Sequence, residues 1–234
     1  MIQGNHNTVL NWSSGKDAAL AYYLLQQDEQ YNVTQLLTTV NNEQDRVVMH
    51  GVREELLDLQ AERIGVKLNK IKLPTSPNHD VYNNAMTNAL NGLKEAGVSH
   101  AAFGDIFLDD LKKYREKQLA SVGFQSVFPL WKKSTVDLVH MVEQVGIEAM
   151  IVCVSEQKLG KEFLGRKVDT SLLNDLPKGV DPCGEHGEFH TFVYNAPYFS
   201  SPIPIQLGES VHRSYKNEAG DWDAGFWFLD VLLD

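Results

Sequence analysis

The sequence predicts an α/β fold, in which a parallel sheet flanked by helices is followed by a smaller C-terminal α/β region. Short apolar runs alternate with amphipathic segments of helical periodicity over the first two thirds of the chain. This alternation requires right-handed crossovers between neighbouring strands and therefore a parallel sheet. A polar turn at 13–17, Ser-Ser-Gly-Lys-Asp, joins the first apolar run to the first helical segment. With 234 residues the chain can bury a large core.

The apolar runs and the helical periodicity assign the elements in order. The expected strands are 7–12, 33–40, 67–73, 100–106, 124–130 and 148–155. The expected helices are 16–27, 51–65, 78–96, 108–122 and a helix capped by Ser134. Gly97 follows the third helix, where a left-handed residue commonly ends a helix. We expect these strands to form the parallel sheet.

The pattern changes after residue 155. Segment 158–176 is predicted to be helical and polar, with an interruption at Gly165. From Pro177 the chain is rich in glycine, proline and aromatic residues, with short β-like runs at 189–194, 203–207 and 226–232. We expect a boundary near 131–134, which separates a nucleotide-binding domain, 1–133, from a substrate-binding domain, 134–234.

The composition bounds the class of protein. The apolar content of 43% and the charged content of 22% are typical of a soluble globular protein, and no apolar run is long enough to span a membrane. The net charge of −10, from 31 acidic and 21 basic residues, disfavours nucleic acid as a partner. Two cysteines in different contexts and the absence of a leader pattern favour a cytoplasmic location.

The turn at 13–17 lies where a strand meets the positive end of a helix dipole, which is typical of a phosphate site. It is not a Walker A loop, because Leu10 occupies the position of the first glycine and Asp17 follows the lysine. It resembles the PP-loop, S-G-G-x-D-S, of the ATP pyrophosphatases. Ser14 replaces the first glycine of that pattern and Ala18 its last serine. The alternative is a polar turn that caps an ordinary helix.

A second motif, GVDPCGEHGEFHTFV at 179–193, concentrates carboxylates, histidines and glycines. Glycines allow a backbone to approach a ligand closely. Cys183, His186 and His190 are possible zinc ligands, but no C-x-x-C pair accompanies them, which disfavours structural zinc. His190 falls in a predicted strand, where a hydrogen-bonded core histidine is the alternative to a catalytic one.

Together the two motifs resemble the diphthine–ammonia ligase family of PP-loop ATP pyrophosphatases, in its short, stand-alone form. The matching segments are 13–17, MHGVR at 49–53, FGDI at 103–106, PLW at 129–131, LGR at 164–166 and 181–193. The resemblance covers nearly the whole chain. It implies a Rossmann-like fold of the adenine nucleotide alpha hydrolase (HUP) type.

The resemblance also implies an ATP-dependent, amide-forming ligase. A carboxylate, small or protein-borne, attacks the α-phosphate of ATP and releases pyrophosphate, and ammonia then converts the acyl-adenylate into an amide and AMP. ATP and Mg²⁺ are the implied cofactors.

The resemblance places several groups of residues at the site. ATP would contact Ser13, Ser14, Gly15, Lys16, Asp17, Thr39, His50 and Gly104, with Arg53 near a phosphate or the substrate carboxylate. Asp17 and Asp105 would hold the metal, although Asp105 is also a candidate N-cap for the helix that follows it. The implied catalytic residues are Lys16, Asp105, Glu185, Glu188 and His190.

Two questions stay open at this stage. Alanine at position 18 cannot donate the hydrogen bond that the family's serine gives to phosphate. Either this hydrogen bond is lost, or the hydroxyl of Ser14 replaces it. The alternative function is therefore a catalytically weakened ATP- or AMP-binding module of the same fold. The aromatic tail at 222–233 packs either on its own domain or on a second copy in a homodimer.

Overall fold

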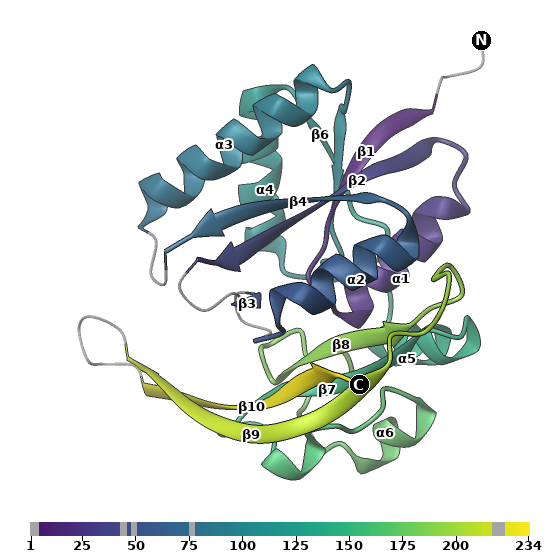
Figure 1. Ribbon diagram of the computed structural model, residues 1–234, viewed down its shortest axis with the longest axis vertical. Coiled ribbons are helices and arrows are strands. Elements are labelled where there is room, and N and C mark those ends of the chain that lie inside the picture. Colours follow the sequence, from purple (N-terminus) through teal and green to yellow (C-terminus); the bar gives the residue numbers. More distant parts are fainter. Residues whose placement is uncertain (1–4, 43–45, 48–50, 75–77, 217–222) are drawn as a thin grey trace.

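The computed structural model describes residues 5–42, 46–47, 51–74, 78–216 and 223–234, and His50 lies outside these ranges. The chain forms two sheets (Figure 1), with the N-terminal sheet above and the C-terminal sheet below. Within the described residues, no helix has the length and apolar character needed to cross a membrane.

The first sheet is the predicted parallel one. Its five parallel strands lie in the order β4 (Lys67–Leu73), β2 (Tyr31–Asn41), β1 (His6–Asn11), β5 (His100–Ala102) and β6 (Gln125–Val127). The short strand β3 (Arg46–Val47) pairs antiparallel with the end of β2. Parallel strands all point their carboxyl ends to one edge of a sheet, which here faces the C-terminal sheet (Figure 1).

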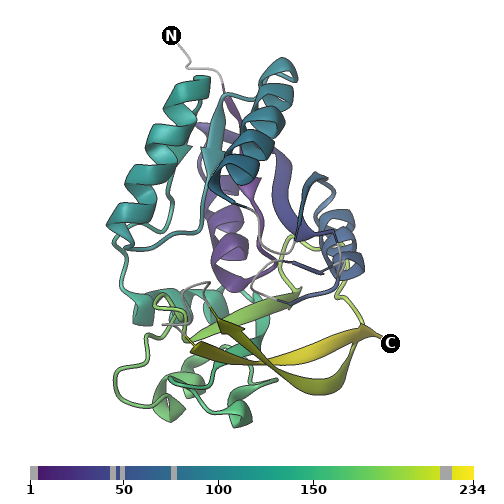
Figure 2. The same ribbon diagram turned by 90° about the vertical axis from the view of Figure 1, so that its left-hand side faces the viewer.

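Helices cover both faces of the parallel sheet (Figures 1 and 2). Helices α1 (Lys16–Gln26) and α2 (Glu54–Ile64) share one core cluster with Leu10 and Leu36. Helices α3 (His79–Glu95) and α4 (Asp109–Val122) pack on the opposite face against Val9 and Leu37. Adjacent residues of β1 and β2 thus bury opposite faces, as the pleat of a strand requires.

The second sheet is antiparallel and includes a strand that we assigned to the parallel sheet. Its order is β8 (Phe189–Asn195), β7 (Glu148–Ser155), β10 (Asp223–Leu233) and β9 (Ile205–Lys216). The prediction that 148–155 extends the parallel sheet is therefore wrong. A strand buried on both faces has the same continuous hydrophobic pattern in a parallel and in an antiparallel sheet. The strands that pair with β7 also come later in the chain, so its neighbours could not be assigned from local sequence.

Helix α5 (Thr135–Gln144) packs beside β7, and its N-cap prediction is confirmed because the Ser134 hydroxyl accepts a hydrogen bond from the amide of Asp137. The helical prediction for 158–176 is mostly wrong. Only a 3₁₀ turn, η1 (Lys161–Phe163), and a short helix, α6 (Thr170–Asp175), form there. Between them, Gly165 is left-handed and the backbone runs along β7, so sheet pairing replaces the helix.

Several boundaries differ from those expected. Strands β5 and β6 stop after three residues each, so that Gly104 and Asp105 lie in the loop beyond β5. Helix α2 begins at Glu54 rather than at residue 51. The short runs expected at 203–207 and 226–232 extend into the long hairpin β9–β10.

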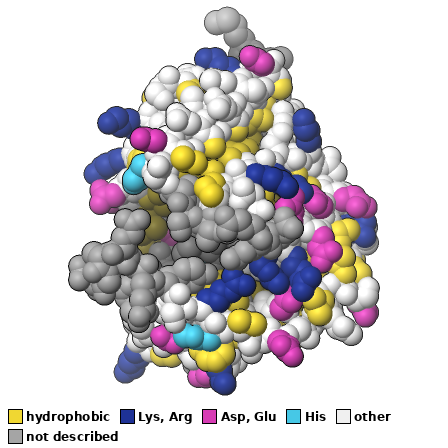
Figure 3. Space-filling model, turned by 60° about the vertical axis from the view of Figure 1, so that its left-hand side comes forward, with side chains coloured by type: hydrophobic (Ala, Val, Ile, Leu, Met, Phe, Trp, Pro, Cys, Tyr) yellow, Lys and Arg dark blue, Asp and Glu magenta, His cyan; other side chains and the backbone are white. Residues whose placement is uncertain are grey.

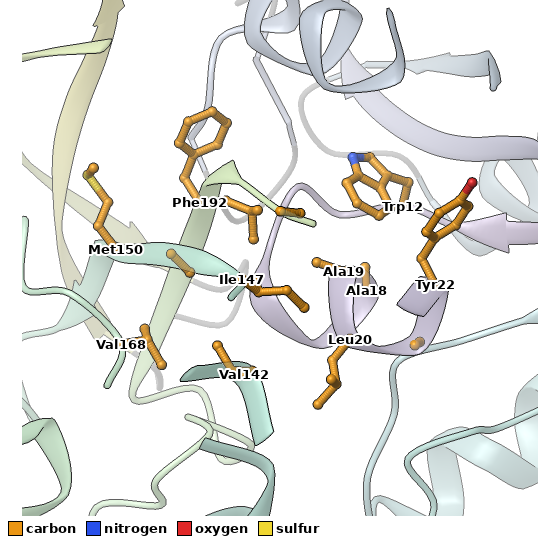
Figure 4. Packing of buried hydrophobic residues seen from close by; sticks show 14 of the residues in the cluster. Trp12, Ala18, Ala19, Leu20, Tyr22, Val142, Ile147, Met150, Val168 and Phe192 are labelled. Atoms are coloured by element: carbon orange, nitrogen blue, oxygen red, sulfur yellow. The ribbon is translucent and has the colours of Figure 1, made fainter. Parts of the chain in front are cut away.

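One apolar cluster spans both sheets. It runs from Leu10, Trp12 and Leu20 in the N-terminal half to Val142 and Phe192 in the C-terminal half. Figure 4 shows Phe192 and Trp12 on neighbouring elements, with Ala18 and Ala19 of α1 between the two halves. The two sheets therefore share a core, and neither closes its own apolar face alone.

Phe192→Ala should lower the free energy of unfolding by about 3–5 kcal/mol, the usual cost of emptying a buried aromatic site. Phe192 is fully buried in the shared cluster, so the loss should move the unfolding of both halves together. Urea unfolding followed by circular dichroism measures the change. Leu207→Ala, at an exposed apolar residue, is the control and should stay within about 0.5 kcal/mol. Independent unfolding of the two halves would contradict the shared core.

Candidate functional site

A cavity of about 500 Å³ lies where the parallel strands end. This volume falls within the range of small-molecule sites. One wall comes from the turn after β1 and the first turn of α1, and another from the ends of β2 and β5. The segment 183–191 of the C-terminal half closes the third side. The lining includes Ser13, Lys16, Asp17, Ala18, Thr38, Thr39, Gly104, Asp105, Cys183, Glu185, His190 and Thr191.

The PP-loop-like turn is attached to the outer edge of β8. The carbonyl of Ser14 accepts a hydrogen bond from the amide of Val193 at 2.9 Å. The backbone amide of Lys16 donates to Oγ1 of Thr191 at 3.0 Å. This second contact uses an amide that we expected to bind phosphate. Strand β8 thus forms hydrogen bonds with β7 on one edge and with the turn on the other.

Ser14 is not a lining residue of the cavity. Its backbone is left-handed, with a φ of 74°, and its side chain is fully buried. Its hydroxyl has no hydrogen-bond partner among the described residues. Neither Ser14 nor Gly15 lines the cavity, whereas Ser13 does. The expectation that the Ser14 hydroxyl replaces the serine missing at position 18 therefore gains no support from the geometry.

Lys16 forms a buried positive charge at the cavity floor. Its Nζ donates to Oδ2 of Asp17 at 2.9 Å and to the carbonyl of Cys183, and it lies over the ring of Phe189. Burial, the largest single effect, lowers the pKa of Lys16, but the acidic groups of Asp17, Cys183 and Glu185 together outweigh it and the pKa rises to about 12. Lys16 is thus a cation at all physiological pH values.

The N-terminus of α1 adds a second positive feature. Gly15 at the N-cap position has no side chain to cap it, and the Thr191 hydroxyl takes the amide of Lys16. The remaining first-turn amides and the helix dipole favour an anion. The helix end and Lys16 together make this part of the cavity suited to an anion.

Asp105 is held by Arg115 rather than serving as an N-cap, which is Leu108. The guanidinium meets both carboxylate oxygens, with Nε 2.8 Å from Oδ2 and Nη2 3.3 Å from Oδ1. Burial raises the pKa of Asp105, and the charge of Arg115 opposes that rise. Arg115 also stacks on the ring of Phe103.

The donor set suits Mg²⁺ only if phosphate supplies most of the ligands. Asp17 and Asp105 both line the cavity, near enough for the charge of Asp17 to raise the pKa of Asp105. No group of three or more metal-binding side chains exists within the described ranges, so a protein-only zinc or magnesium cage is not seen there. Mg²⁺ commonly takes one or two carboxylates together with substrate phosphates and water.

Two carboxylates of the second motif build the loop 181–188. Oδ1 of Asp181 accepts from the amides of Cys183 at 2.8 Å and Glu185 at 3.3 Å. The Glu188 carboxylate accepts from the amides of His186 at 2.9 Å and Asp181 at 3.3 Å. Glu188 is buried and is not a lining residue of the cavity. The structure therefore does not bring this predicted catalytic residue to the site.

Glu185, by contrast, lies in the cavity wall. Its Oε2 accepts from the amide of Ile106 at 3.4 Å. Burial and the nearby charge of Asp17 raise the pKa of Glu185 to about 7, against the opposing effect of Lys16. A carboxylate with a pKa near neutrality can both accept and release a proton, as general acid–base catalysis requires.

The other predicted residues divide between those at the cavity and those elsewhere. Thr39 and His190 line it. Gly104 also lines it, and a Cβ there would lie 2.8 Å from the backbone carbon of Asp17, so only glycine allows this approach to α1. Arg53 instead forms a bidentate ion pair with Asp230 of β10.

Three residues that support the turn or the cavity were not predicted from the sequence. Arg115 and Gln60 lie on amphipathic helices, where a polar residue is normally solvent-exposed, and no local pattern distinguishes them. Thr191 lies inside the second motif, so that motif could have indicated it.

On the face in Figure 3, Lys and Arg side chains are interspersed with Asp and Glu side chains.

Comparison with known proteins gives matches to both halves of the chain. The family model of the diphthamide synthase N-terminal domain matches residues 6–126, and that of the C-terminal domain matches 134–226. The human diphthine–ammonia ligase is 26% identical over 193 residues, which cover 74% of this chain and 71% of the relative. The zebrafish (Danio rerio) diphthine–ammonia ligase is 26% identical over 192 residues, covering 74% of each.

A solved structure is also similar, the U34-tRNA thiolase NcsA from Methanococcus maripaludis with its 4Fe-4S cluster. It is 19% identical with a TM-score of 0.37, over 61% of this chain and 58% of that one. The match of the N-terminal family model alone spans half of the sequence. The chain belongs to the diphthamide synthase family.

Proposed function

We propose that this protein is an ATP-dependent ligase that joins a carboxylate to ammonia and forms AMP and pyrophosphate. The names of its relatives, diphthine–ammonia ligases, support the reaction class. The observation that carries the proposal is the composition of one cavity. It combines a buried cation at a helix N-terminus, Lys16, with a carboxylate of near-neutral pKa, Glu185.

The reaction has two steps that balance. An oxygen of the substrate carboxylate attacks the α-phosphorus of ATP, the bond to the bridging oxygen breaks, and pyrophosphate leaves with the electron pair. Ammonia then attacks the acyl carbon, loses a proton, and expels AMP, which retains one oxygen of the original carboxylate. Adenylation is needed because a free carboxylate offers ammonia no leaving group.

Lys16 and the N-terminus of α1 serve the first step. Their positive charge stabilises the negative charge that develops on the leaving pyrophosphate, and both are fixed before the substrate binds. Mg²⁺, held by Asp17 and Asp105 and by phosphate oxygens, would supply further charge neutralisation. The Arg115 pair keeps Asp105 oriented toward the cavity.

Glu185 serves the second step. Its position in the wall contributed by the C-terminal half puts it in the same cavity as Lys16 and Asp17. Above its pKa the carboxylate attracts ammonium and accepts the proton that the attacking nitrogen releases. His190, on the same wall, is the second candidate for that proton transfer.

The carboxylate substrate is diphthine or a small carboxylic acid. The relatives' names favour diphthine, a carboxylate borne by a protein. The alternative function, a nucleotide-binding module with weakened turnover, rests on Ala18. Its methyl group lines the cavity where the PP-loop pattern has a serine, so one hydrogen bond to phosphate would be missing.

Incubation with ATP, Mg²⁺, ammonium and a carboxylate labelled with ¹⁸O should release pyrophosphate and transfer one ¹⁸O into AMP. Lys16→Met should reduce the rate at least about a hundredfold, as loss of a preorganised charge does in other enzymes. Mass spectrometry of AMP measures the transfer, and a coupled assay measures pyrophosphate. The panel includes an acceptor protein bearing diphthine and a set of small carboxylic acids.

Lys117→Met, at an exposed lysine of α4, is the matched control and should retain the wild-type rate. Nucleotide binding without pyrophosphate release for every carboxylate in the panel would instead support the binding module. Pyrophosphate release with unlabelled AMP would contradict the acyl-adenylate.

The ammonia-dependent rate should rise with pH through about 7, because Glu185 must lose its proton before it can accept another, and its pKa is raised to about 7. Rates are measured at saturating ATP and carboxylate and divided by the concentration of unprotonated ammonia at each pH. Glu185→Gln should lower the rate by about 10²–10⁴ and abolish the rise.

Glu162→Gln, an exposed residue outside the cavity, controls for a general change in charge and should leave the profile unchanged. A wild-type rise that persists in Glu185→Gln would exclude this residue as the base. Its loss in His190→Gln would then assign the proton transfer to that histidine.

A further inference from the structure

We propose that Gln60 is a positioning residue, which fixes the shape of the nucleotide-binding turn by joining it to β8. Gln60 lies on α2 and is fully buried, although no sequence motif includes it. Its role in ATP binding rests on the function proposed above, whereas its effect on the turn itself does not.

The amide of Gln60 makes three hydrogen bonds. Oε1 accepts from the indole Nε1 of Trp12 at 2.8 Å, and Nε2 donates to the carbonyls of Ser14 at 3.1 Å and Val193 at 2.6 Å. Trp12 ends the approach to the turn, Ser14 lies within it, and Val193 belongs to β8. One side chain thus connects three segments that are far apart in the sequence.

The partners leave one orientation for this amide. An indole nitrogen can only donate and a backbone carbonyl can only accept, so Oε1 must face Trp12 and the NH₂ group must face the two carbonyls. A carboxylate at position 60 would face two carbonyls without a donor. An apolar side chain would remove the partner that the indole N–H of Trp12 and the carbonyl of Val193 have in Gln60, and would leave the Ser14 carbonyl with the Val193 amide alone. Glutamine is therefore specified by its surroundings, since unpaired buried groups are costly.

Ser14 explains why the turn needs such support. A residue with a Cβ pays an energetic cost in the left-handed region, which persists only where neighbours determine the conformation. Two donors, the Val193 amide and Gln60, hold the Ser14 carbonyl in place. The adjoining Gly15 and Lys16 begin α1, so the direction of the Ser14 peptide sets where the helix end and Lys16 meet the cavity.

The test combines Gln60→Met with Ser14→Gly. Gln60→Met preserves length and removes the three hydrogen bonds, so the turn should relax toward ordinary backbone angles. Amide exchange in the peptide covering 13–19, measured by mass spectrometry without nucleotide, should accelerate about tenfold, and ATP should bind about tenfold more weakly by calorimetry, the size of one net hydrogen bond. Ser14→Gly removes the cost of the left-handed conformation and should restore much of both values in the double variant.

Two controls separate positioning from general stability. Gln118→Met, at a hydrogen-bonded glutamine of α4 outside the cavity, should change neither value. Leu57→Ala, also fully buried on α2, should lower global stability without a selective effect on the turn. If Gln60→Met does not fold, Gln60→Asn replaces it, since its amide is withdrawn by one methylene, and a smaller loss of the same kind is expected.

The proposal is overturned if exchange in the turn is unchanged in the folded Gln60 variant. It is also overturned if Leu57→Ala accelerates that exchange equally, or if Ser14→Gly gives no recovery. Absence of ATP binding in the wild-type protein would contradict the proposed function instead, and the exchange measurement would still decide the role of Gln60.

Discussion

The attachment of the PP-loop-like turn to the edge of β8 is the interaction on which the site depends. The turn emerges from the parallel sheet, yet the antiparallel sheet satisfies its backbone through Val193 and Thr191. An edge strand left open would be a liability, and here the turn covers it. Because one apolar cluster continues beneath this contact, the two halves fix each other's positions. The shape of the cavity between them is therefore set by the packing of the two halves against each other.

The carboxylates near the cavity differ in the hydrogen-bond donors that they receive. Asp181 and Glu188 receive backbone amides and shape their loop, while Asp105 receives the guanidinium of Arg115. Burial and the nearby charge of Asp17 raise the pKa of Glu185, and its one long hydrogen bond from a backbone amide among the described residues opposes that rise weakly. Asp181 and Glu188 each receive two backbone amides and hold the loop, whereas Glu185 keeps a proton affinity useful at neutral pH.

The sequence predicted the first half of the fold well because its signals are local. Apolar runs, the cap at Ser134 and the glycine after α3 each depend on residues within a few positions. The membership of β7 in the second sheet could not be read this way, since its partners β8 and β10 lie far along the chain. The segment around Gly165 failed for the same reason, because pairing with β7 outweighed its helical preference.

The site was predicted in part. Both motifs do meet in one cavity, and most of the residues expected there line it. Glu185 and Glu188 look equivalent in the sequence, three positions apart, and only the folded loop shows which one receives backbone donors. Ser14 was expected to contact phosphate because it lies in the PP-loop-like turn at the start of the first helix. Its burial against β8 is a long-range contact that no spacing rule contains.

The proposed function requires that one cavity, built jointly by the two halves, hold ATP with its α-phosphorus between Lys16 and Glu185. A crystal structure of the full chain with Mg²⁺ and an ATP analogue that cannot be cleaved between its α- and β-phosphates would test this requirement. We expect the triphosphate at the N-terminus of α1, the α-phosphorus facing Glu185, and the turn still bonded to β8. A triphosphate bound away from Lys16, or a turn released from β8 on binding, would contradict it.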